Sequence, residues 1–227
     1  MGMTYMTKIL SIFSCLILIS SCELSFPLYQ LIYQSGKTFI GNTQDTQISE
    51  ETFERIDYAF IRASFGIGSP KSILILVREK NNVLEWISAE SEKIYTFNGK
   101  IIKTSGLPHD IEIVNYEDFP EFTSSSTESK SLIVNFMNPE LFYQEQYLEL
   151  IKKNDKQIPH HIKGRSPINA LLYEENIYMP KIYWEVTNTY HINPDSGQIE
   201  RTVQKIHPDL PPISIDFIKN IIETKYS

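Results

Sequence analysis

The sequence predicts an all-β protein, a large antiparallel meander that forms a curved sheet, a barrel-like body or a sandwich, with one or two short helices near the N-terminus. The chain contains about ten segments rich in branched and aromatic residues, and Gly, Pro and Asn separate them at hairpin spacing. It also contains 13 Tyr and 12 Phe, which favour strands and suit a body with a broad interior.

The N-terminal 21 residues have the layout of an export signal. Lys8 precedes an apolar run, Ile9–Ile19, which ends at Ser20-Ser21-Cys22. A membrane-spanning helix needs about 20 apolar residues, and this run is near half that length, so a cleaved signal fits better than a permanent span. We therefore expect a signal peptide at 1–21, a lipidated N-terminus and tether at 22–50, and a single antiparallel β domain at 51–227.

Cys22 is the predicted lipid attachment site. Ile19-Ser20-Ser21-Cys22 is an aliphatic-small-small triplet followed by a thiol, as lipoprotein processing requires. The sulfur takes the diacylglycerol, and cleavage before Cys22 frees an amino group for a further acyl chain such as palmitate; two or three chains make the anchor stable. The alternative is a small apolar cysteine without modification. Cys15 lies in the signal, so the mature chain has no disulfide.

The charge of the chain excludes some partners. The net charge is −7, and removal of the signal takes away Lys8 alone. Without a basic cluster, neither nucleic acid nor anionic head groups can be bound by charge. We expect the covalent lipid to provide the membrane contact, and we expect no cofactor.

The first half of the mature chain should begin with a tether and a short helix. A tether containing a short helix is expected at 23–48, and Ser49 is a candidate N-cap for a brief helix that ends at Arg55. Three strands should follow, at Ile56–Phe65, Ser72–Val77 and Glu85–Ala89.

The clearest local signal is a hairpin at Lys93–Thr104. Asn98-Gly99 tolerates the two positive φ angles of a type I′ turn. A two-residue loop pairs Phe97 with Lys100, Thr96 with Ile101 and Tyr95 with Ile102. Lys93, Lys100 and Lys103 should then keep the hairpin partly in water.

The second half should contain further strands and one polar loop. The Ser/Thr-rich stretch at 123–131 is expected to be a loop, and Pro139–Lys153 favours a strand over a helix because its neighbours are strands. In Lys181–Ile192, Trp184, Val186 and Tyr190 alternate with polar residues, as in a half-buried strand. The other expected strands are Ile111–Val114, Leu132–Met137, Ala170–Tyr173, Ile177–Met179, Gln198–Ile206 and Ile213–Ile222.

Few residues suggest chemistry. Adjacent His160 and His161 would point to opposite faces of a strand, so they are expected in a solvated loop and not as ligands of one metal. Phe65–Ser72 lacks the spacing of a phosphate loop. No Gly-x-Ser-x-Gly elbow marks a nucleophile, so we expect no catalytic residue and no enzymatic activity.

The two tryptophans are candidate glycan-binding residues. Trp86 and Trp184 lie on predicted strands and could stack on sugar rings. The alternative is that both pack in the core, and this is the better interpretation because large aromatic side chains dominate the burial of β cores.

Several segments together resemble the YjbF/GfcB-type lipoproteins of exopolysaccharide and group 4 capsule operons. They lie within Cys22–Lys219 and are Tyr58–Arg62, Trp86–Ser88, Gly99–Leu107 and Asn188–Tyr190 with Asn193–Gly197, Gln204 and Pro208. The chain has Tyr190-His191 where the family tends to have Tyr-Trp, and Thr123–Arg165 matches poorly.

This resemblance implies an antiparallel β fold and attachment to the outer membrane, where the domain would face the periplasm. Glu23 is consistent with this, since it replaces the Asp usual for inner-membrane retention. The expected function is that of a non-enzymatic accessory factor in capsule or exopolysaccharide assembly or export, with polysaccharide-export proteins as partners. The alternative is a module that binds the polysaccharide through exposed aromatic residues in a cleft. Glycan hydrolysis would need two carboxylates across a cleft, and the sequence selects none.

Overall fold

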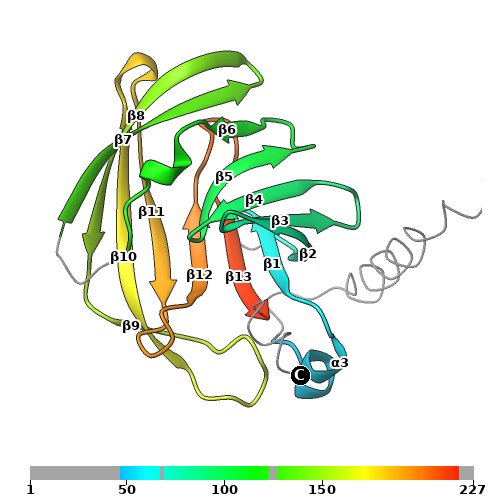
Figure 1. Ribbon diagram of the computed structural model, residues 1–227. Helices are drawn as coiled ribbons and strands as arrows, with labels where there is room; N and C mark the ends of the chain where they lie inside the picture. Colours follow the sequence, from blue (N-terminus) through cyan, green and yellow to red (C-terminus); the bar gives the residue numbers. More distant parts are fainter. Residues whose placement is uncertain (1–46, 67–68, 123–126, 220–227) are drawn as a thin grey trace, which may run out of the picture.

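The computed structural model describes residues 47–66, 69–122 and 127–219, which form a β-barrel with one α-helix (Figure 1). The helix is α3 (Glu50–Arg55), and two 3-10 turns are η1 (Tyr116–Asp118) and η2 (Pro180–Ile182). The strands are β1 (Phe60–Phe65), β2 (Ser72–Lys80), β3 (Val83–Ser88), β4 (Lys93–Phe97), β5 (Lys100–Ser105), β6 (Ile111–Ile113), β7 (Thr127–Met137), β8 (Glu140–Lys152), β9 (Lys156–Ile158), β10 (Ile168–Met179), β11 (Trp184–Ile192), β12 (Ile199–Gln204) and β13 (Ile213–Lys219).

The strands close on themselves. The order around the sheet is β11-β12-β13-β1 and then in sequence through β8 to β10, and β10 also pairs with β11, which closes a 12-stranded antiparallel barrel. The short β9 pairs with the start of β10 outside this ring. The predicted all-β class is confirmed, and of the three forms considered the closed barrel is the one adopted. Closure removes the free sheet edges that an open meander would leave.

Apolar side chains fill the barrel interior. The largest fully buried members of this interior cluster include Trp86, Tyr190 and Phe136. Residues 114–122, which follow β6, fold over the interior, where the rings of Phe119 and Phe122 lie 5.9 and 5.1 Å from that of Tyr190 (Figure 1). This segment therefore packs as an internal plug against the interior cluster.

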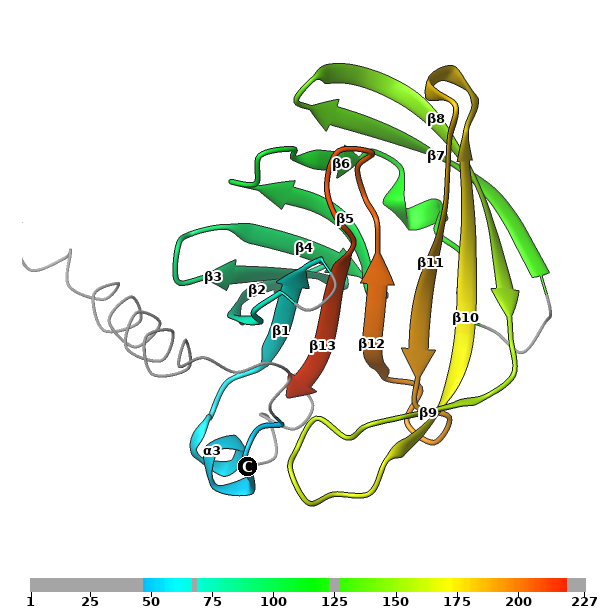
Figure 2. The same cartoon turned by 180° about the vertical axis from the view of Figure 1, so that it is seen from behind.

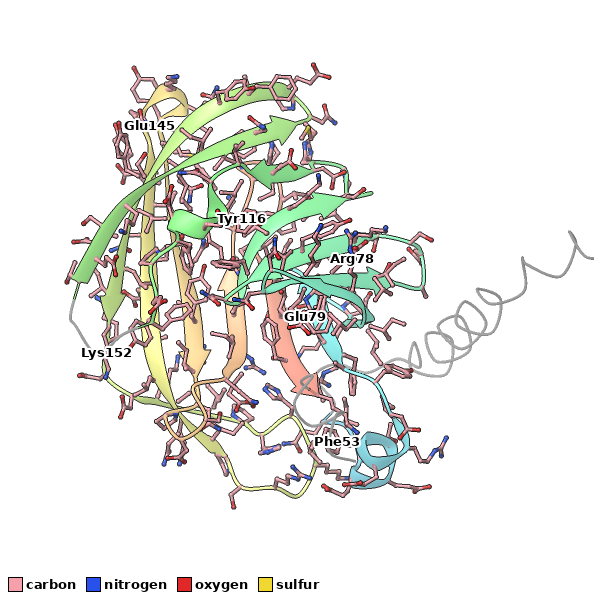
Figure 3. The ribbon with its side chains drawn as sticks, viewed as in Figure 1. Phe53, Arg78, Glu79, Tyr116, Glu145 and Lys152 are labelled. Atoms are coloured by element: carbon pink, nitrogen blue, oxygen red, sulfur yellow. The ribbon has the colours of Figure 1, made fainter. Side chains whose placement is uncertain are left out.

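A second apolar cluster lies outside the barrel, where α3 covers the foot of β1 and β13 (Figures 1 and 3). Ile61 belongs to the interior cluster, so its neighbour Phe60 points outward, and Phe60 meets Phe53 of α3 and Ile162. The predicted N-cap is confirmed, since Ser49 Oγ accepts from the Thr52 N–H at 3.2 Å. Within the described residues, no helix combines the length and the apolar character needed to cross a bilayer.

The predicted hairpin is present with one shift in register. Asn98 and Gly99 have φ of 47° and 73°, and Phe97 pairs with Lys100 as expected. The expected pairing of Tyr95 with Ile102 is wrong, because a bulge between Tyr95 and Thr96 places Tyr95 opposite Lys103.

The expectation that Lys100 lies in water is also wrong, because this side chain is 2% exposed and points into the barrel. Its Nζ lies 2.5 Å from Oε1 of Glu175 on β10, which is fully buried. Oε2 of Glu175 accepts from Asn188 Nδ2 at 2.9 Å and from the Tyr190 hydroxyl at 2.8 Å. Gln204 extends the network to the hairpin by donating to the Gly99 carbonyl at 2.7 Å. A polar network therefore crosses the apolar interior and joins β5, β10, β11 and β12.

Other sequence expectations differ in extent more than in kind. The segment Pro139–Lys153 is a strand, as expected, and β13 lies where the last strand was predicted. The stretch 123–131 is not all loop, since β7 already begins at Thr127; a long partner strand, β8, gives it ladder bonds. The two short strands expected within 170–179 are one strand, β10, and β9 was not predicted. Of the segment 23–48, where a short helix was expected, only Gln47 and Ile48 are described, and residues 220–222 of the last strand also lie outside the described residues.

Candidate functional site

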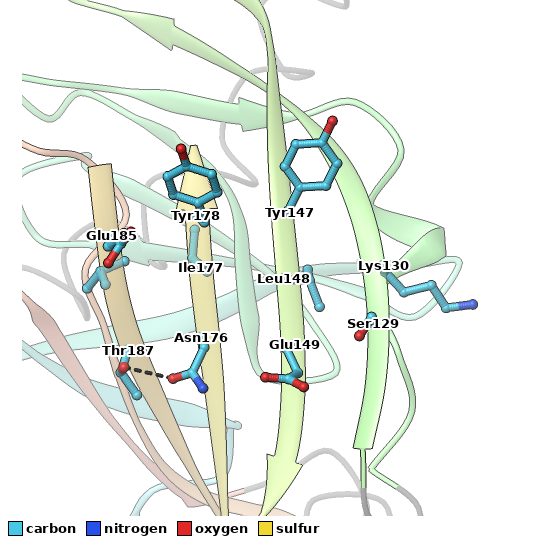
Figure 4. A pocket seen from close by; sticks show the side chains of 11 residues that line it. Ser129, Lys130, Tyr147, Leu148, Glu149, Asn176, Ile177, Tyr178, Glu185 and Thr187 are labelled. Carbon is cyan, nitrogen blue, oxygen red and sulfur yellow. Dashed lines mark hydrogen bonds between the residues drawn. The ribbon is translucent and has the colours of Figure 1, made fainter. Parts of the chain in front are cut away.

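A groove of 680 Å³ runs along the outer wall over β7, β8, β10 and β11 (Figure 4). Two cross-strand rows of side chains build it. Tyr147, Tyr178 and Glu185 are direct neighbours across β8, β10 and β11. The second row is Ser129, Glu149, Asn176 and Thr187.

Strand alternation explains why these side chains point out of the barrel. Leu148 and Ile177 belong to the interior core, so Tyr147 and Tyr178 beside them point outward. The two tyrosines are 43% and 42% exposed. Neighbouring tyrosines on a wet sheet face offer apolar surface that folding itself does not bury.

The polar groups of the groove are suited to hydroxyl-rich ligands. Asn176 Oδ1 accepts from Thr187 Oγ1 at 2.8 Å, and the Glu149 and Glu185 carboxylates are exposed acceptors. A hydrogen bond with Glu145 raises the pKa of Tyr147, so its hydroxyl stays neutral at physiological pH. The one lysine of the lining, Lys130, pairs with Glu128 at 3.2 Å. Acceptors exceed cations here, which favours a neutral sugar over an anionic one.

Further exposed aromatic residues occur on the same strands and turns. Phe142 and Tyr143 of β8 are 47% and 72% exposed, and Tyr183 after η2 is 91% exposed. Tyr143 and Tyr183 have φ of 54° and 50°, in the left-handed region that costs a non-glycine residue about 1–2 kcal/mol. None of these three lines the groove itself.

Comparison with models of protein families shows the family to which the chain belongs. The family model described as group 4 capsule polysaccharide lipoprotein GfcB, YjbF matches residues 32–218, which is most of the 227-residue sequence. The chain belongs to this family. The resemblance inferred from short segments is thereby confirmed, and the GfcB/YjbF family is one of capsule lipoproteins, consistent with a membrane-anchored location.

A solved structure shares the fold. The hypothetical lipoprotein YmcC from Escherichia coli (K12) superposes with a TM-score of 0.65 at 15% sequence identity, and the match covers 78% of this chain and 91% of that one. At this identity the likeness supports the fold alone. A search of curated proteins gives no significant match.

The site residues predicted from sequence fall in different places. Cys22, the expected lipid attachment site of this GfcB/YjbF member, lies outside the described residues. Trp86 has no exposed surface, and its indole N–H donates to Thr96 Oγ1 at 2.9 Å inside the barrel, so it cannot stack on a sugar. Trp184 is half-buried and packs against the interior cluster.

The sequence analysis did not predict Tyr147 and Tyr178 as site residues. Strand alternation did, however, indicate that Trp184 packs in the core. Trp184 shares a face with Val186 and Tyr190, and that apolar face is the one turned inward. The same alternation places Tyr178 on the outer face, but only after the two short strands expected within 170–179 are joined into one.

The His160-His161 pair is not in a solvated loop, contrary to the expectation. His161 is 4% exposed, and the two ring centroids are 6.3 Å apart. The loop between β9 and β10 turns back onto the barrel wall, and the backbone N–H of Ile48 donates to the His161 carbonyl at 2.9 Å. Tertiary packing thus buries one imidazole of the pair.

Among the described residues, one group could offer three ligand atoms to a metal. Donor atoms of His109, His207 and Asp209 all lie within 4.8 Å of one another. However, His207 Nδ1 already accepts from the Asp209 N–H at 3.0 Å, so a neutral His207 carries its proton on Nε2. Only His109 Nε2 and the Asp209 carboxylate then remain as ligands, fewer than the three or four that a zinc site needs.

Proposed function

We propose that the protein is a lipid-anchored, non-enzymatic accessory factor in the assembly or export of a capsule polysaccharide. Membership of the capsule lipoprotein family carries this proposal. The lipid would sit on Cys22, with the barrel on the periplasmic side of the outer membrane and in contact with polysaccharide-export proteins.

A binding function suits the groove better than hydrolysis. Its carboxylates, Glu149 and Glu185, are both exposed on the wall. Catalytic carboxylic acids are usually set in apolar surroundings that keep them protonated. Exposed carboxylates serve instead as acceptors for ligand hydroxyl groups.

Deletion of the gene tests the accessory function. Surface polysaccharide should fall while cytoplasmic precursors stay unchanged, and the wild-type gene should restore it. Unchanged surface polysaccharide in the deletion strain would contradict the proposal. The same strain expressing Cys22→Ser should incorporate no palmitate; labelling of that variant would refute the assignment of the anchor.

A second candidate function is direct binding of the polysaccharide in the groove. The adjacent exposed rings of Tyr147 and Tyr178 favour it, because aromatic faces contribute about 0.5–1.5 kcal/mol each in well-stacked contacts. Tyr147→Ala and Tyr178→Ala should each weaken binding of the purified surface polysaccharide by up to roughly tenfold, measured by calorimetry. Tyr183→Ala removes an exposed ring outside the groove and is the matched control. Equal affinities for all three variants would exclude the groove.

A further inference from the structure

The exposed large apolar side chains gather on one part of the barrel. Of the eight such side chains among the described residues, six lie on β8, at the end of β7 or on the β10–β11 hairpin; they are Met137, Phe142, Tyr143, Tyr147, Tyr178 and Tyr183. Tyr147 and Tyr178 line the groove, and the other four do not. These four, Met137, Phe142, Tyr143 and Tyr183, are called the apolar rim below.

The strand register brings the rim to one end of the barrel. Tyr147 of β8 pairs with Tyr178 of β10 in an antiparallel ladder, and η2 lies against β8. Tyr143 comes before the first of these in the chain and Tyr183 comes after the second, so both lie toward the same end. Met137 ends β7 at the turn of the β7–β8 hairpin. Figure 2 shows this hairpin and the β10–β11 turn at one end of the barrel and α3 at the other.

Two tyrosines of the rim are held outward at a cost in backbone strain. Tyr143 and Tyr183 have φ of 54° and 50°, a conformation that favours glycine or asparagine over a bulky side chain. The Tyr143 N–H donates to Asn135 Oδ1 at 2.8 Å, and the Tyr183 N–H donates to the Pro180 carbonyl at 3.3 Å. Because both rings are largely exposed, packing within the protein does not offset the strain. Such a surface is typical of a contact with something outside the protein.

The opposite end of the barrel is polar. The helix α3 presents Glu51, Glu54 and Arg55 to water. Among the described residues of α3 and of the loop between β9 and β10, no large apolar side chain is exposed. The protein therefore has one polar end, at which the described chain begins with Gln47, and one apolar end.

The chain between the predicted lipid and the barrel is long enough for either end to reach a bilayer. Residues 23–46 separate Cys22 from Gln47. A chain of that length spans up to roughly 80 Å when extended. The longest barrel dimension is smaller, since the 12 residues of β10 extend over about 40 Å. A lipid on Cys22 thus keeps a bilayer within reach of the rim.

We propose that the apolar rim lies in the head-group region of the bilayer in which the chain is anchored, so that α3 points away from the membrane. This inference rests on the proposed lipid anchor at Cys22. Tyrosine suits the interface because its ring is apolar and its hydroxyl remains in contact with water. The charges beside the rim, Glu140, Glu145 and Lys181, form no basic cluster. Burial of apolar surface, and not attraction to anionic head groups, therefore drives the contact.

The mature lipoprotein, reconstituted into phosphatidylcholine vesicles, tests the proposal. Cys22 is its one cysteine, so a fluorophore can be attached at a single new cysteine. Lys181→Cys places the fluorophore beside the rim, and Glu54→Cys on α3 is the matched control; both positions are exposed. A lipid with a nitroxide on its head group should quench the fluorophore at 181 and not the one at 54. Quenching at 54 alone, equal quenching at both positions, or no quenching would overturn the proposal.

Variants of the rim show whether its rings make the contact. Tyr143→Asn combined with Tyr183→Asn should abolish quenching at 181, and asparagine tolerates the positive φ angles, so the fold should be retained; thermal unfolding checks this. Tyr147→Ser removes an exposed ring of the groove and should leave quenching unchanged. Quenching that persists in the double variant would overturn the role of the rim. Loss of quenching in high salt would show that charges make the contact, and would also contradict the proposal.

Palmitate labelling separates this inference from the proposed anchor. A wild-type protein without palmitate would refute the anchor and the membrane contact together. A protein that carries palmitate and shows no quenching would overturn the membrane contact alone, and the rim would then be a candidate surface for a protein partner.

Discussion

The buried ion pair between Lys100 and Glu175 allows a quantitative test of the interior network. Both side chains are essentially inaccessible, at 2% and 0% exposure, and their charged atoms are 2.5 Å apart. Glu175→Gln keeps the shape of the side chain but leaves the Lys100 ammonium without a counter-charge. Removing one partner of a buried pair costs about 3–5 kcal/mol, a large part of the 5–15 kcal/mol that typically holds a domain folded.

Urea unfolding followed by tryptophan fluorescence measures this cost. Glu175→Gln and Lys100→Met should each lower the free energy of unfolding by about 3–5 kcal/mol. The double variant should lose far less than the sum, because no unpaired charge then remains inside the barrel. A loss in the double variant equal to the sum of the two single losses would refute the coupling between Lys100 and Glu175.

The same hairpin strand supplies a matched control. Lys103 also forms an ion pair, with Glu112 at 2.7 Å, but these side chains are 44% and 37% exposed. Water screens such a pair, so Lys103→Met should cost no more than about 1 kcal/mol. A cost of Lys100→Met as small as that of Lys103→Met would mean that the Lys100 ammonium reaches water.

Three further predictions concern the turns, the buried histidine His161 and the core tryptophan. Gly99→Ala should lower the stability measured by thermal unfolding by about 2–3 kcal/mol, because φ is +73° and a Cβ would lie 3.0 Å from the Ile199 side chain. Gly197→Ala is the control: φ is +69° but the space beside it is open, so only the backbone strain of about 1 kcal/mol is expected. Equal losses for the two variants would contradict the predicted contact with Ile199. Folding lowers the pKa of His161 from 6.5 to about 4, so between these pH values the unfolded chain binds a proton that the folded chain does not bind. The free energy of unfolding should therefore fall as the pH drops through this window, by about 2 kcal/mol at pH 5. His161→Gln should make this decline smaller in urea unfolding. Trp86→Phe should cost about 1–3 kcal/mol by leaving a void and an unpaired Thr96 hydroxyl, and a loss of polysaccharide binding without a loss of stability would contradict its assignment to the core.

Much of the fold was predictable because strand signals are local. Asn98-Gly99 specifies a tight turn through the φ angles these residues tolerate, and the structure has that turn. The alternation in Lys181–Ile192 predicted one buried face, and Asn188, Tyr190 and Ile192 are buried there. The register shift at Tyr95 could not be predicted, because the turn residues fix only the pairs next to the turn, and the bulge between β4 and β5 lies beyond them.

The candidate sites were much less predictable. Lys100 resembles any hairpin lysine until Glu175, 75 residues further along, is placed opposite it. His161 resembles a loop histidine until the loop folds back over Asp216. Tyr147 and Tyr178 are ordinary strand residues until pairing of β8 with β10 makes them neighbours.

By itself the sequence determined the all-β class and the family, and it predicts the export signal and the lipid acceptor at Cys22, since each of these depends on short contiguous segments. The tertiary structure alone decided that the meander closes into a barrel and which polar side chains it buries. It also decided which aromatic rings remain outside. The physical reason is that a strand specifies two faces by alternation, whereas ring closure and distant covering segments determine which face meets water and which charges meet each other.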